Sequence, residues 1–297
     1  MQDRLGREID YMRISITDRC NLRCGYCMPE CGVPSVPHDM ILRFDEIIGL
    51  VKIFCSMGIK NVKITGGEPL VRKGAVGLIK DIKAIDGIEK VSMTTNGILL
   101  SKNLKALAEA GIDSINISLD TLNRQKYLNI TGFDGLNTVL KAIDECRAFP
   151  EIKVKINAVT MADYNRNEIC ALADYAAEVG ATLRFIEMMP LGLGTGFDGY
   201  SQDEIIAVLE ESYGSAKTIN DKAGSGPAKY YSFEGLEGRI GFISPMSHKF
   251  CGSCNRIRIT SEGLLRPCLG SDVGIDLRKP MREGASDEEL AQIIHDG

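Results

Sequence analysis

The chain contains no tryptophan, no low-complexity tract and no block of like charge, so nothing in it indicates a disordered arm. No apolar run approaches the roughly 20 residues that a membrane-spanning helix requires. The first residues, Met1 to Arg4, lack the basic and apolar regions of a secretory signal. These absences predict a globular protein of the cytoplasm without a membrane partner.

The charge balance excludes another class of partner. The formal net charge of −5 argues against a general nucleic-acid binder, although a local cationic pocket remains compatible with it. With 297 residues, 44% of them hydrophobic, the chain can build one large barrel-type domain or a barrel with a smaller companion.

Ten cysteines in a chain without a secretory signal indicate a reducing compartment rather than disulfides. Three of them, Cys20, Cys24 and Cys27, stand in a Cys-x3-Cys-x2-Cys loop after the strand-like run Met12–Thr17. A 4Fe–4S cube is usually held by four thiolates. A three-thiol loop would therefore leave one iron open to a ligand that the protein does not supply.

Two other sites are compatible with this loop. A structural zinc ion would need a fourth ligand, which Cys31 or His38 could supply. Cys31 could also close a ferredoxin-like cluster with four thiolates. The spacing, together with Tyr26 before the last cysteine, resembles the radical S-adenosylmethionine superfamily. That resemblance implies that the methionyl amine and carboxylate of the cofactor chelate the open iron.

After the cysteine loop, short β-branched runs alternate with longer helical patterns, which is typical of βα units on a parallel sheet. The expected fold is α/β, a partial (β/α)6 TIM-type barrel with a smaller C-terminal α+β domain. The predicted strands are Met12–Thr17, Asn61–Thr65, Lys90–Thr94, Ser114–Leu119, Ile152–Val159 and Thr182–Met188. The predicted helices are Phe44–Met57, Lys73–Ile85, Lys102–Ala110, Leu136–Phe149 and Glu168–Val179.

These strands alternate with a period of two, whereas parallel strands buried on both faces normally read as continuous apolar runs. If the helices pack against the apolar face of the strands, the polar face lines the inside of the barrel. A six-stranded, incompletely closed barrel can keep a wet interior, which a closed eight-stranded one fills. The inward face then carries four cations, which imply an anionic ligand and most simply a phosphate: Arg13, Lys63, Lys155 and Arg184.

Further motifs follow the predicted strands at their carboxyl ends, where the active sites of barrels lie. Thr65-Gly66-Gly67-Glu68-Pro69 comes directly after the second strand, and its glycines let the backbone approach a ligand closely. The turn resembles the stretch of the superfamily that holds the methionyl amine. Later strands end in the same register at Thr94, Ser118 and Met189, although Met189 is also compatible with simple core packing.

A glycine-rich stretch from Leu191 to Tyr200 predicts a boundary between residues 1–195, the partial barrel, and residues 196–297, a C-terminal domain. A helix over Ser201–Tyr213 and strands near Lys229–Phe233 and Arg239–Ile243 should follow. A second set of three thiols then appears in the tail, Cys251, Cys254 and Cys268. Their spacing suits either zinc, with His248 as the fourth ligand, or a second cluster.

The two cysteine triads, the Gly-Gly turn and the stretch from Gly241 through Leu269 together resemble the MoaA family, the GTP 3′,8-cyclases of molybdenum cofactor biosynthesis. The resemblance runs from about Asp3 to about Leu290. It implies a lyase with two 4Fe–4S clusters and S-adenosylmethionine as cofactors, GTP as substrate and a low-potential electron donor. In this family a radical made from the cofactor takes hydrogen from carbon 3′ of GTP, and the sugar then bonds to carbon 8 of guanine.

The resemblance also implies roles for single residues. Cys20, Cys24 and Cys27 would hold the first cluster, and Cys251, Cys254 and Cys268 the second. The residues around S-adenosylmethionine would be Tyr26, Gly67, Ser118 and Met189. The residues facing GTP would be Arg13, Lys63, Thr94, Lys155, Arg184, Arg256, Ile257 and Arg258.

Some features depart from the family. Its members continue to a Gly-Gly tail that enters the active site, whereas this sequence stops at Gly297. Lys63 stands where many members have arginine, which keeps the charge but loses bidentate phosphate geometry. A radical peptide-modifying enzyme and an electron-transfer or zinc-binding module are the alternatives, and a homodimer is compatible with the sequence.

Overall fold

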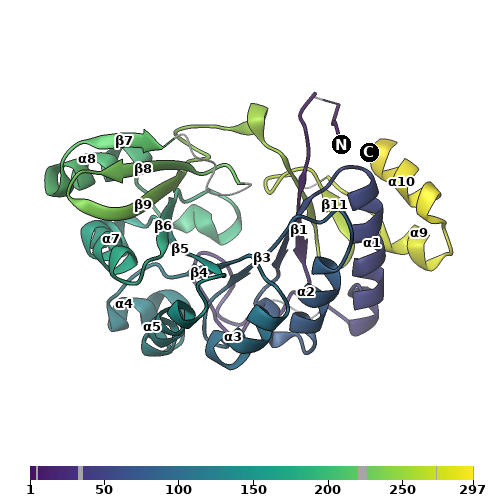
Figure 1. The fold of residues 1–297 in the computed structure, drawn as a ribbon, viewed down its shortest axis with the longest axis horizontal. Helices are drawn as coiled ribbons and strands as arrows, with labels where there is room; N and C mark the ends of the chain where they lie inside the picture. Colours follow the sequence, from purple (N-terminus) through teal and green to yellow (C-terminus); the bar gives the residue numbers. More distant parts are fainter. Residues whose placement is uncertain (5, 33–35, 220–225, 272, 297) are drawn as a thin grey trace.

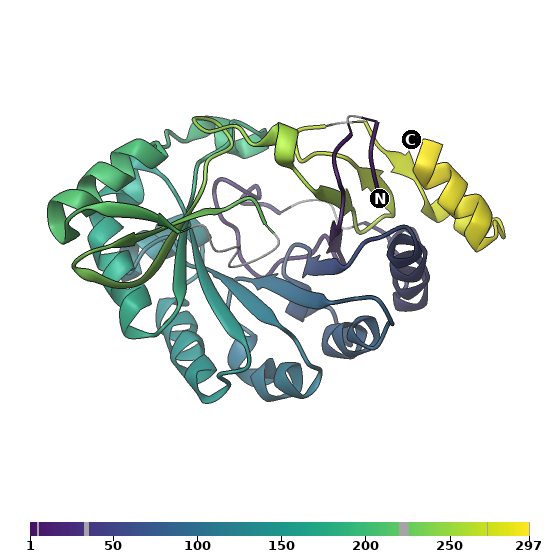
Figure 2. The same cartoon turned by 45° about the horizontal axis from the view of Figure 1, so that its top comes forward.

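An arc of six parallel strands forms the centre of the computed structural model, which describes residues 1–4, 6–32, 36–219, 226–271 and 273–296. The strands pair in chain order, and Figure 2 shows them fanning around an open side. They are β1 (Tyr11–Ser15), β2 (Asn61–Thr65), β3 (Lys90–Thr95), β4 (Ser114–Ser118), β5 (Lys153–Val159) and β6 (Thr182–Ile186).

Helices cover the outer face of this arc (Figure 1). They are α1 (Phe44–Ser56), α2 (Ala75–Lys83), α3 (Leu100–Glu109), α4 (Arg124–Thr131), α5 (Leu136–Glu145) and α7 (Ile169–Glu178), while the short α6 (Ala162–Asn165) lies in the segment between β5 and α7. Their apolar stripes pack against the apolar face of the strands in one continuous core. Gly58, Gly111 and Gly180 follow α1, α3 and α7 with positive φ, the left-handed conformation that ends a helix.

The alternation along the strands separates two environments, as the sequence predicts. Met12 and Ile14 of β1 and Val62 and Ile64 of β2 are almost completely buried among the helices. The alternate residues point into the arc, where Lys63 is also buried. Polar side chains that are buried on the inner face of the strands indicate an enclosed polar interior rather than a solvent-exposed sheet edge.

The C-terminal segment extends both edges of the arc instead of forming a separate sheet. β9 (Leu236–Ile243) pairs in parallel with β6 and continues antiparallel to β8 (Lys229–Phe233) and β7 (Ala216–Ile219). At the other edge, β10 (Arg256–Ile259) pairs in parallel with β1 and continues to β11 (Leu264–Arg266) and β12 (Ile275–Asp276). The result is a sheet of twelve strands that is not closed within the described residues.

The remaining helices belong to this C-terminal segment. α8 (Gln202–Tyr213) begins with a capping box in which Ser201 and Glu204 satisfy each other's backbone N–H groups. α9 (Arg278–Arg282) and α10 (Asp287–Asp296) lie beside α1, and Arg282 of α9 contacts the buried carboxylate of Glu46 in α1.

The sequence located the six strands of the arc to within two residues at each end, and β8 matches its prediction. It missed α4, although Asn123 caps the start of this helix and Gly132 ends it in the left-handed conformation.

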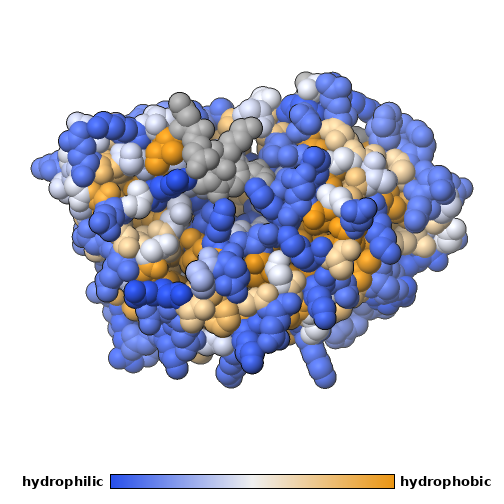
Figure 3. Space-filling view, viewed as in Figure 1, coloured by the Kyte–Doolittle hydropathy of each residue, from blue (hydrophilic) through white to orange (hydrophobic). Residues whose placement is uncertain are grey.

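No described helix is long and apolar enough to cross a membrane. Hydrophilic side chains dominate the rim of the face drawn in Figure 3.

Candidate active site

The first cysteine triad occupies the loop that follows β1. Cys20 and Cys24 are partly buried, and Cys27 is exposed. Burial raises the pKa of all three thiols, and neighbouring thiols of the triad raise those of Cys24 and Cys27 further. The three thiols therefore lie in an environment that disfavours thiolates unless a cationic group binds them.

A close backbone contact holds the Gly-Gly turn against this loop. The amide of Gly67 donates to the carbonyl of Thr17 at 2.7 Å. A Cβ atom at position 67 would lie 2.2 Å from the carbonyl oxygen of Arg19, so no side chain fits there. Glycine at position 67 therefore sets the separation between the turn and the start of the cysteine loop.

Glu68 connects this turn to the end of β3. Its buried carboxylate accepts hydrogen bonds from the hydroxyl of Thr95 at 2.9 Å and the amide of Asn96 at 2.7 Å. The side chain of Asn96 in turn approaches Cys20 Sγ at 3.8 Å. The loops after β1, β2 and β3 thus form one hydrogen-bonded unit around the triad.

Tyr26, inside the triad, is held from two sides. Its hydroxyl donates to Asp120 at 2.8 Å, and the other carboxylate oxygen of Asp120 accepts from the amide of Val159 at 2.8 Å. The ring of Phe197, from the glycine-rich stretch, packs edge-on against Tyr26 with centroids 6.2 Å apart. Burial raises the pKa of Asp120 to about 6.

The other residues predicted to surround S-adenosylmethionine lie at the same end of the arc. Ser118 ends β4 and lines a small cavity with Cys24, Tyr26 and Asp120. Met189 lies just after β6 and is half-buried. Strand order brings these residues to one rim although they are distant in sequence, as expected for the carboxyl ends of parallel strands.

The inward cations are adjacent because of the strand register. Arg13 of β1 lies between Arg258 of β10 and Lys63 of β2 on neighbouring strands. Lys155 of β5 lies opposite Asn116, which lies opposite Thr94 of β3. Lys63, Lys155 and Arg184 also line one cavity inside the arc, which confirms the inward orientation that the alternation predicts for them.

Arg184 of β6 completes the set. Its guanidinium donates to Asn157 Oδ1 through Nε at 2.9 Å and Nη2 at 2.7 Å. Gly241 of β9 leaves room for this side chain, since a Cβ atom there would lie 2.8 Å from Arg184 Cγ and from the ring of Tyr230. Glycine at position 241 thus allows β9 to pair with β6 without displacing the arginine.

The cations destabilise one another's charge. Burial and the charges of Arg184, Arg13 and Lys155 hold the pKa of Lys63 well below its usual range. Burial, Arg184, Lys153 and Lys90 lower the pKa of Lys155 to about 8. Such crowding of like charge is relieved when a polyanion binds.

The second triad lies next to these cations. Burial opposes ionisation of the Cys254 thiol, but the charge of Arg256 and hydrogen bonds from that residue leave its pKa lowered overall. Burial, Arg13 and Arg256 lower the pKa of Arg258 to about 9, whereas Cys268 and Cys254 act in the opposite direction. Cys254 and Cys268 are thus both near Arg258.

Successive side chains of β10 point to opposite faces of the strand, as the sequence predicts. Ile257 is buried on the opposite face from its two arginine neighbours, and the guanidinium of Arg256 lies 5.2 Å from the ring centroid of Phe250. Cys251 and Cys268 are exposed, and Cys254 is partly buried.

The geometry bears on the zinc alternatives. Within the described ranges, no three His, Cys, Asp or Glu side chains are grouped so that they could hold a single metal ion. His248, the fourth ligand of a zinc site, instead places Nδ1 at 2.9 Å from the Ser247 hydroxyl and Nε2 at 3.6 Å from Asp203. Cys31 is exposed, and its thiol contacts the carbonyl of Gly32. Two sets of three thiols suit clusters with an open iron better than single ions.

Sequence reasoning missed three residues of this site. Asp120 ended a strand motif, and Asn157 lay on the polar face of its strand, but neither had a visible partner. Phe197 gave no signal, because a single aromatic residue in a glycine-rich stretch can pack anywhere.

Comparison with known proteins agrees with this geometry. The Radical SAM superfamily model matches residues 14–176, and the Molybdenum Cofactor Synthesis C model matches residues 181–297. The GTP 3′,8-cyclase of Clostridium perfringens is 48% identical over 297 residues, which cover 99% of this chain and 91% of the relative. That of Pelotomaculum thermopropionicum is 43% identical with the same coverage.

Among solved structures, SuiB of Streptococcus suis bound to S-adenosylmethionine aligns with a TM-score of 0.67 over 96% of this chain and 68% of that one. Its 16% identity shows a shared fold only. A second neighbour, anSMEcpe with bound AdoMet, aligns with a TM-score of 0.61 over 95% of this chain and 83% of its own. The chain therefore belongs to the radical S-adenosylmethionine superfamily and, within it, to the family of GTP 3′,8-cyclases.

Proposed function

We propose that the arc of strands holds GTP between two 4Fe–4S clusters, each bound by one of the cysteine triads. As a member of its family, the chain is a lyase that converts GTP to a 3′,8-cyclised nucleotide in molybdenum cofactor biosynthesis. The observation that carries the site assignment is the set of inward cations on neighbouring strands of the arc, which reaches the second triad at Arg258.

The cofactors fit the donor sets. Cys20, Cys24 and Cys27 would hold the first cluster and leave one iron for S-adenosylmethionine, and Cys251, Cys254 and Cys268 would hold the second. When bound, the first cluster and S-adenosylmethionine supply the one-electron chemistry that begins hydrogen abstraction. We assign residues 1–195 to this first site and residues 196–297 to the second, whereas the two family matches divide the chain earlier, between residues 176 and 181.

The chain's own residues would bind, orient and shield the substrate and the cofactor. Arg13, Lys63, Lys155, Arg184, Arg256 and Arg258 would bind the triphosphate through charge-assisted hydrogen bonds, with Thr94 and the backbone of Ile257 beside them. Tyr26, Gly67, Ser118 and Met189 would surround S-adenosylmethionine. Asp120 and Phe197 fix the ring of Tyr26, so this wall of the cofactor site is preorganised.

The first test concerns the cysteines of the β1 loop. Protein reconstituted without oxygen should form 5′-deoxyadenosine and cyclised nucleotide from GTP, S-adenosylmethionine and a reductant. Replacing Cys20, Cys24 or Cys27 with alanine should abolish both products, whereas Cys31→Ala is the matched control and should keep them. Loss of activity in Cys31→Ala would mean that the first cluster is closed by four thiolates.

The second test is metal content. Two 4Fe–4S clusters require about eight irons per chain with little zinc. A variant with alanine in place of Cys251, Cys254 and Cys268 should hold about four and still bind S-adenosylmethionine. One tightly held zinc with about four irons in the unaltered protein would refute the assignment of the second triad.

A further inference from the structure

We propose that the opposite end of the arc, at the amino ends of the strands, is a cationic mouth that captures the triphosphate of the incoming nucleotide. We define this cationic mouth by Lys90 and Lys153. The inference rests on the proposed function, since it concerns how GTP reaches the inward cations.

The mouth opens into a cavity of about 690 Å³, a size typical of small-molecule sites. Its outer lining comes from the first residues of the strands, including Asn61, Lys90 and Lys153. Its inner lining includes Lys155 and Arg184 of the proposed phosphate site. The cysteine loop after β1 and the Gly-Gly turn after β2 follow the carboxyl ends of their strands, so this opening is separate from the proposed cofactor rim.

The two mouth lysines are available to an anion. Lys90 begins β3 and Lys153 begins β5, and both side chains are exposed. Neither forms an ion pair with any described residue. Asp113, an acidic residue of the lining, is already occupied, because its carboxylate contacts Lys83 Nζ at 2.7 Å and the amide of Val91 at 2.7 Å.

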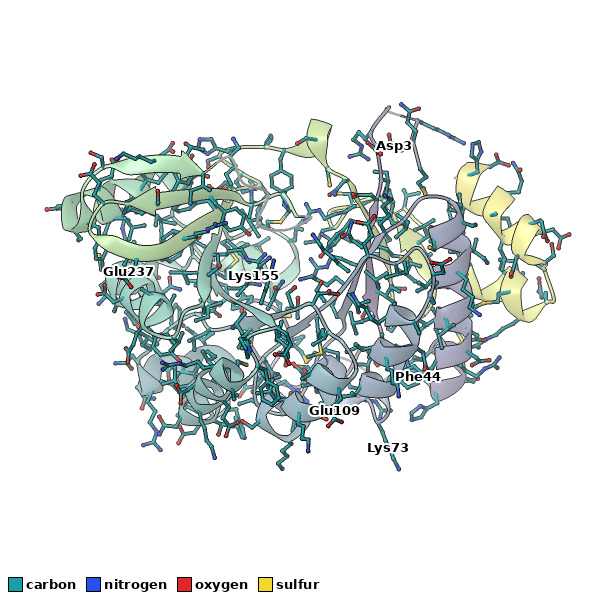
Figure 4. The ribbon with its side chains drawn as sticks, viewed as in Figure 1. Asp3, Phe44, Lys73, Glu109, Lys155 and Glu237 are labelled. Atoms are coloured by element: carbon teal, nitrogen blue, oxygen red, sulfur yellow. The ribbon has the colours of Figure 1, made fainter. Side chains whose placement is uncertain are left out.

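The mouth is electrostatically continuous with the interior. Lys90 and Lys153 both lower the pKa of Lys155, which places their charges near that buried ammonium group. Lys155 and Arg184 in turn act on Lys63, and Arg13 acts on it from the other side. An anion entering at the mouth therefore meets successive cations from solvent to the centre of the arc. Figure 4 labels Lys155 within the arc, in contrast with Lys73 and Glu109 on the outer surface.

Such a path has a kinetic consequence. Among the residues that the structure describes, the cavity lining has seven cationic side chains and two acidic ones, Asp113 and Glu151. A cleft in which charge of one sign predominates concentrates counter-ions and raises association rates by about 10- to 1000-fold. The exposed lysines should thus speed the encounter with a triphosphate, while the buried cations determine how long it stays.

The experiment measures association with 2-aminopurine riboside 5′-triphosphate, a fluorescent guanine analogue, by anaerobic stopped flow with the holoenzyme. The test variant is Lys90→Gln with Lys153→Gln. The matched control is Lys102→Gln with Lys105→Gln, which removes two exposed lysines from the outer helix α3. Neither change removes a buried contact, so both variants should fold.

The mouth variant should associate about tenfold more slowly than the control at low salt, with dissociation changed less than about twofold. The difference should shrink in about 0.5 M salt, because the ions screen exposed charges. The uncharged 2-aminopurine riboside should bind both variants equally. Equal association of the triphosphate with both variants, or an equal loss for the uncharged riboside, would overturn the inference.

Turnover of GTP separates this inference from the proposed function. If the unaltered enzyme forms cyclised nucleotide while the mouth variant associates as fast as the control, only the capture role fails. If the unaltered enzyme makes no such product while triphosphate association still depends on the mouth lysines, the capture role stands and the proposed reaction fails.

Discussion

Replacing Lys155 with methionine should stabilise the protein and weaken its binding of GTP. Methionine keeps most of the length of the side chain and removes the ammonium group. Lys155 is only 8% exposed, and burial, Arg184, Lys153 and Lys90 lower its pKa from 10.5 to about 8. A change of this size corresponds to about 3 kcal/mol between the folded and unfolded states.

The sign of this effect follows from the direction of the pKa change. Because the folded chain binds this proton less tightly than the unfolded chain, the charged lysine costs the most below pH 8. The cost falls as the pH rises from about 8 to 10.5, where the side chain becomes neutral in both states. We therefore expect Lys155→Met to raise the free energy of unfolding by about 1–3 kcal/mol at pH 7, less the loss of any contact its ammonium group makes.

Binding should change in the opposite direction. One charge-assisted contact to phosphate contributes about 1.5–3 kcal/mol, so GTP affinity should fall by about 10- to 150-fold at pH 7. In the unaltered protein, GTP affinity should also decline above about pH 8, as Lys155 loses its proton.

Thermal unfolding of the anaerobic holoprotein with and without GTP, together with calorimetric titration of GTP, measures both effects. The nucleotide-free variant should unfold a few degrees above the unaltered protein at pH 7, with a smaller difference near pH 10. Lys102→Met on the exposed face of α3 is the control and should change neither quantity appreciably. A lower unfolding temperature combined with unchanged GTP affinity would refute the reasoning.

Three further substitutions test the close contacts of the site. Gly67→Ala should displace the cysteine loop, because its Cβ would overlap the Arg19 carbonyl, and should weaken S-adenosylmethionine binding at least tenfold as measured by calorimetry. The control is Gly77→Ala in α2, where a Cβ meets nothing within 4 Å, and it should leave binding intact. Asp120→Leu should weaken S-adenosylmethionine binding by about tenfold through loss of one hydrogen bond to Tyr26, and Asp120→Asn should restore most of it; equal binding by both variants would exclude this positioning role. Gly241→Ala should push Arg184 aside and reduce GTP affinity while both clusters stay loaded, and an unchanged affinity would show that the arginine does not need this space.

The sequence alone determined the strands of the arc and the faces of their side chains. Alternation within a strand is a local property, since successive side chains point to opposite faces whatever the strand pairs with. Arg13, Lys63, Lys155 and Arg184 could therefore be placed inside before any tertiary contact was known. The spacing of Cys20, Cys24 and Cys27 is local in the same way.

Tertiary structure decided which of these local features meet. β10 pairs with β1 across more than 240 residues, which places Arg258 beside Arg13. Tyr26 reaches Asp120 across 94 residues, and Phe197 covers the ring of Tyr26 from the glycine-rich stretch. No pattern of period two or 3.6 encodes such partners, because many strand edges and apolar rings in the chain satisfy the same local rules. Only the closure of these long loops, driven by burial of the shared core, selects one partner for each.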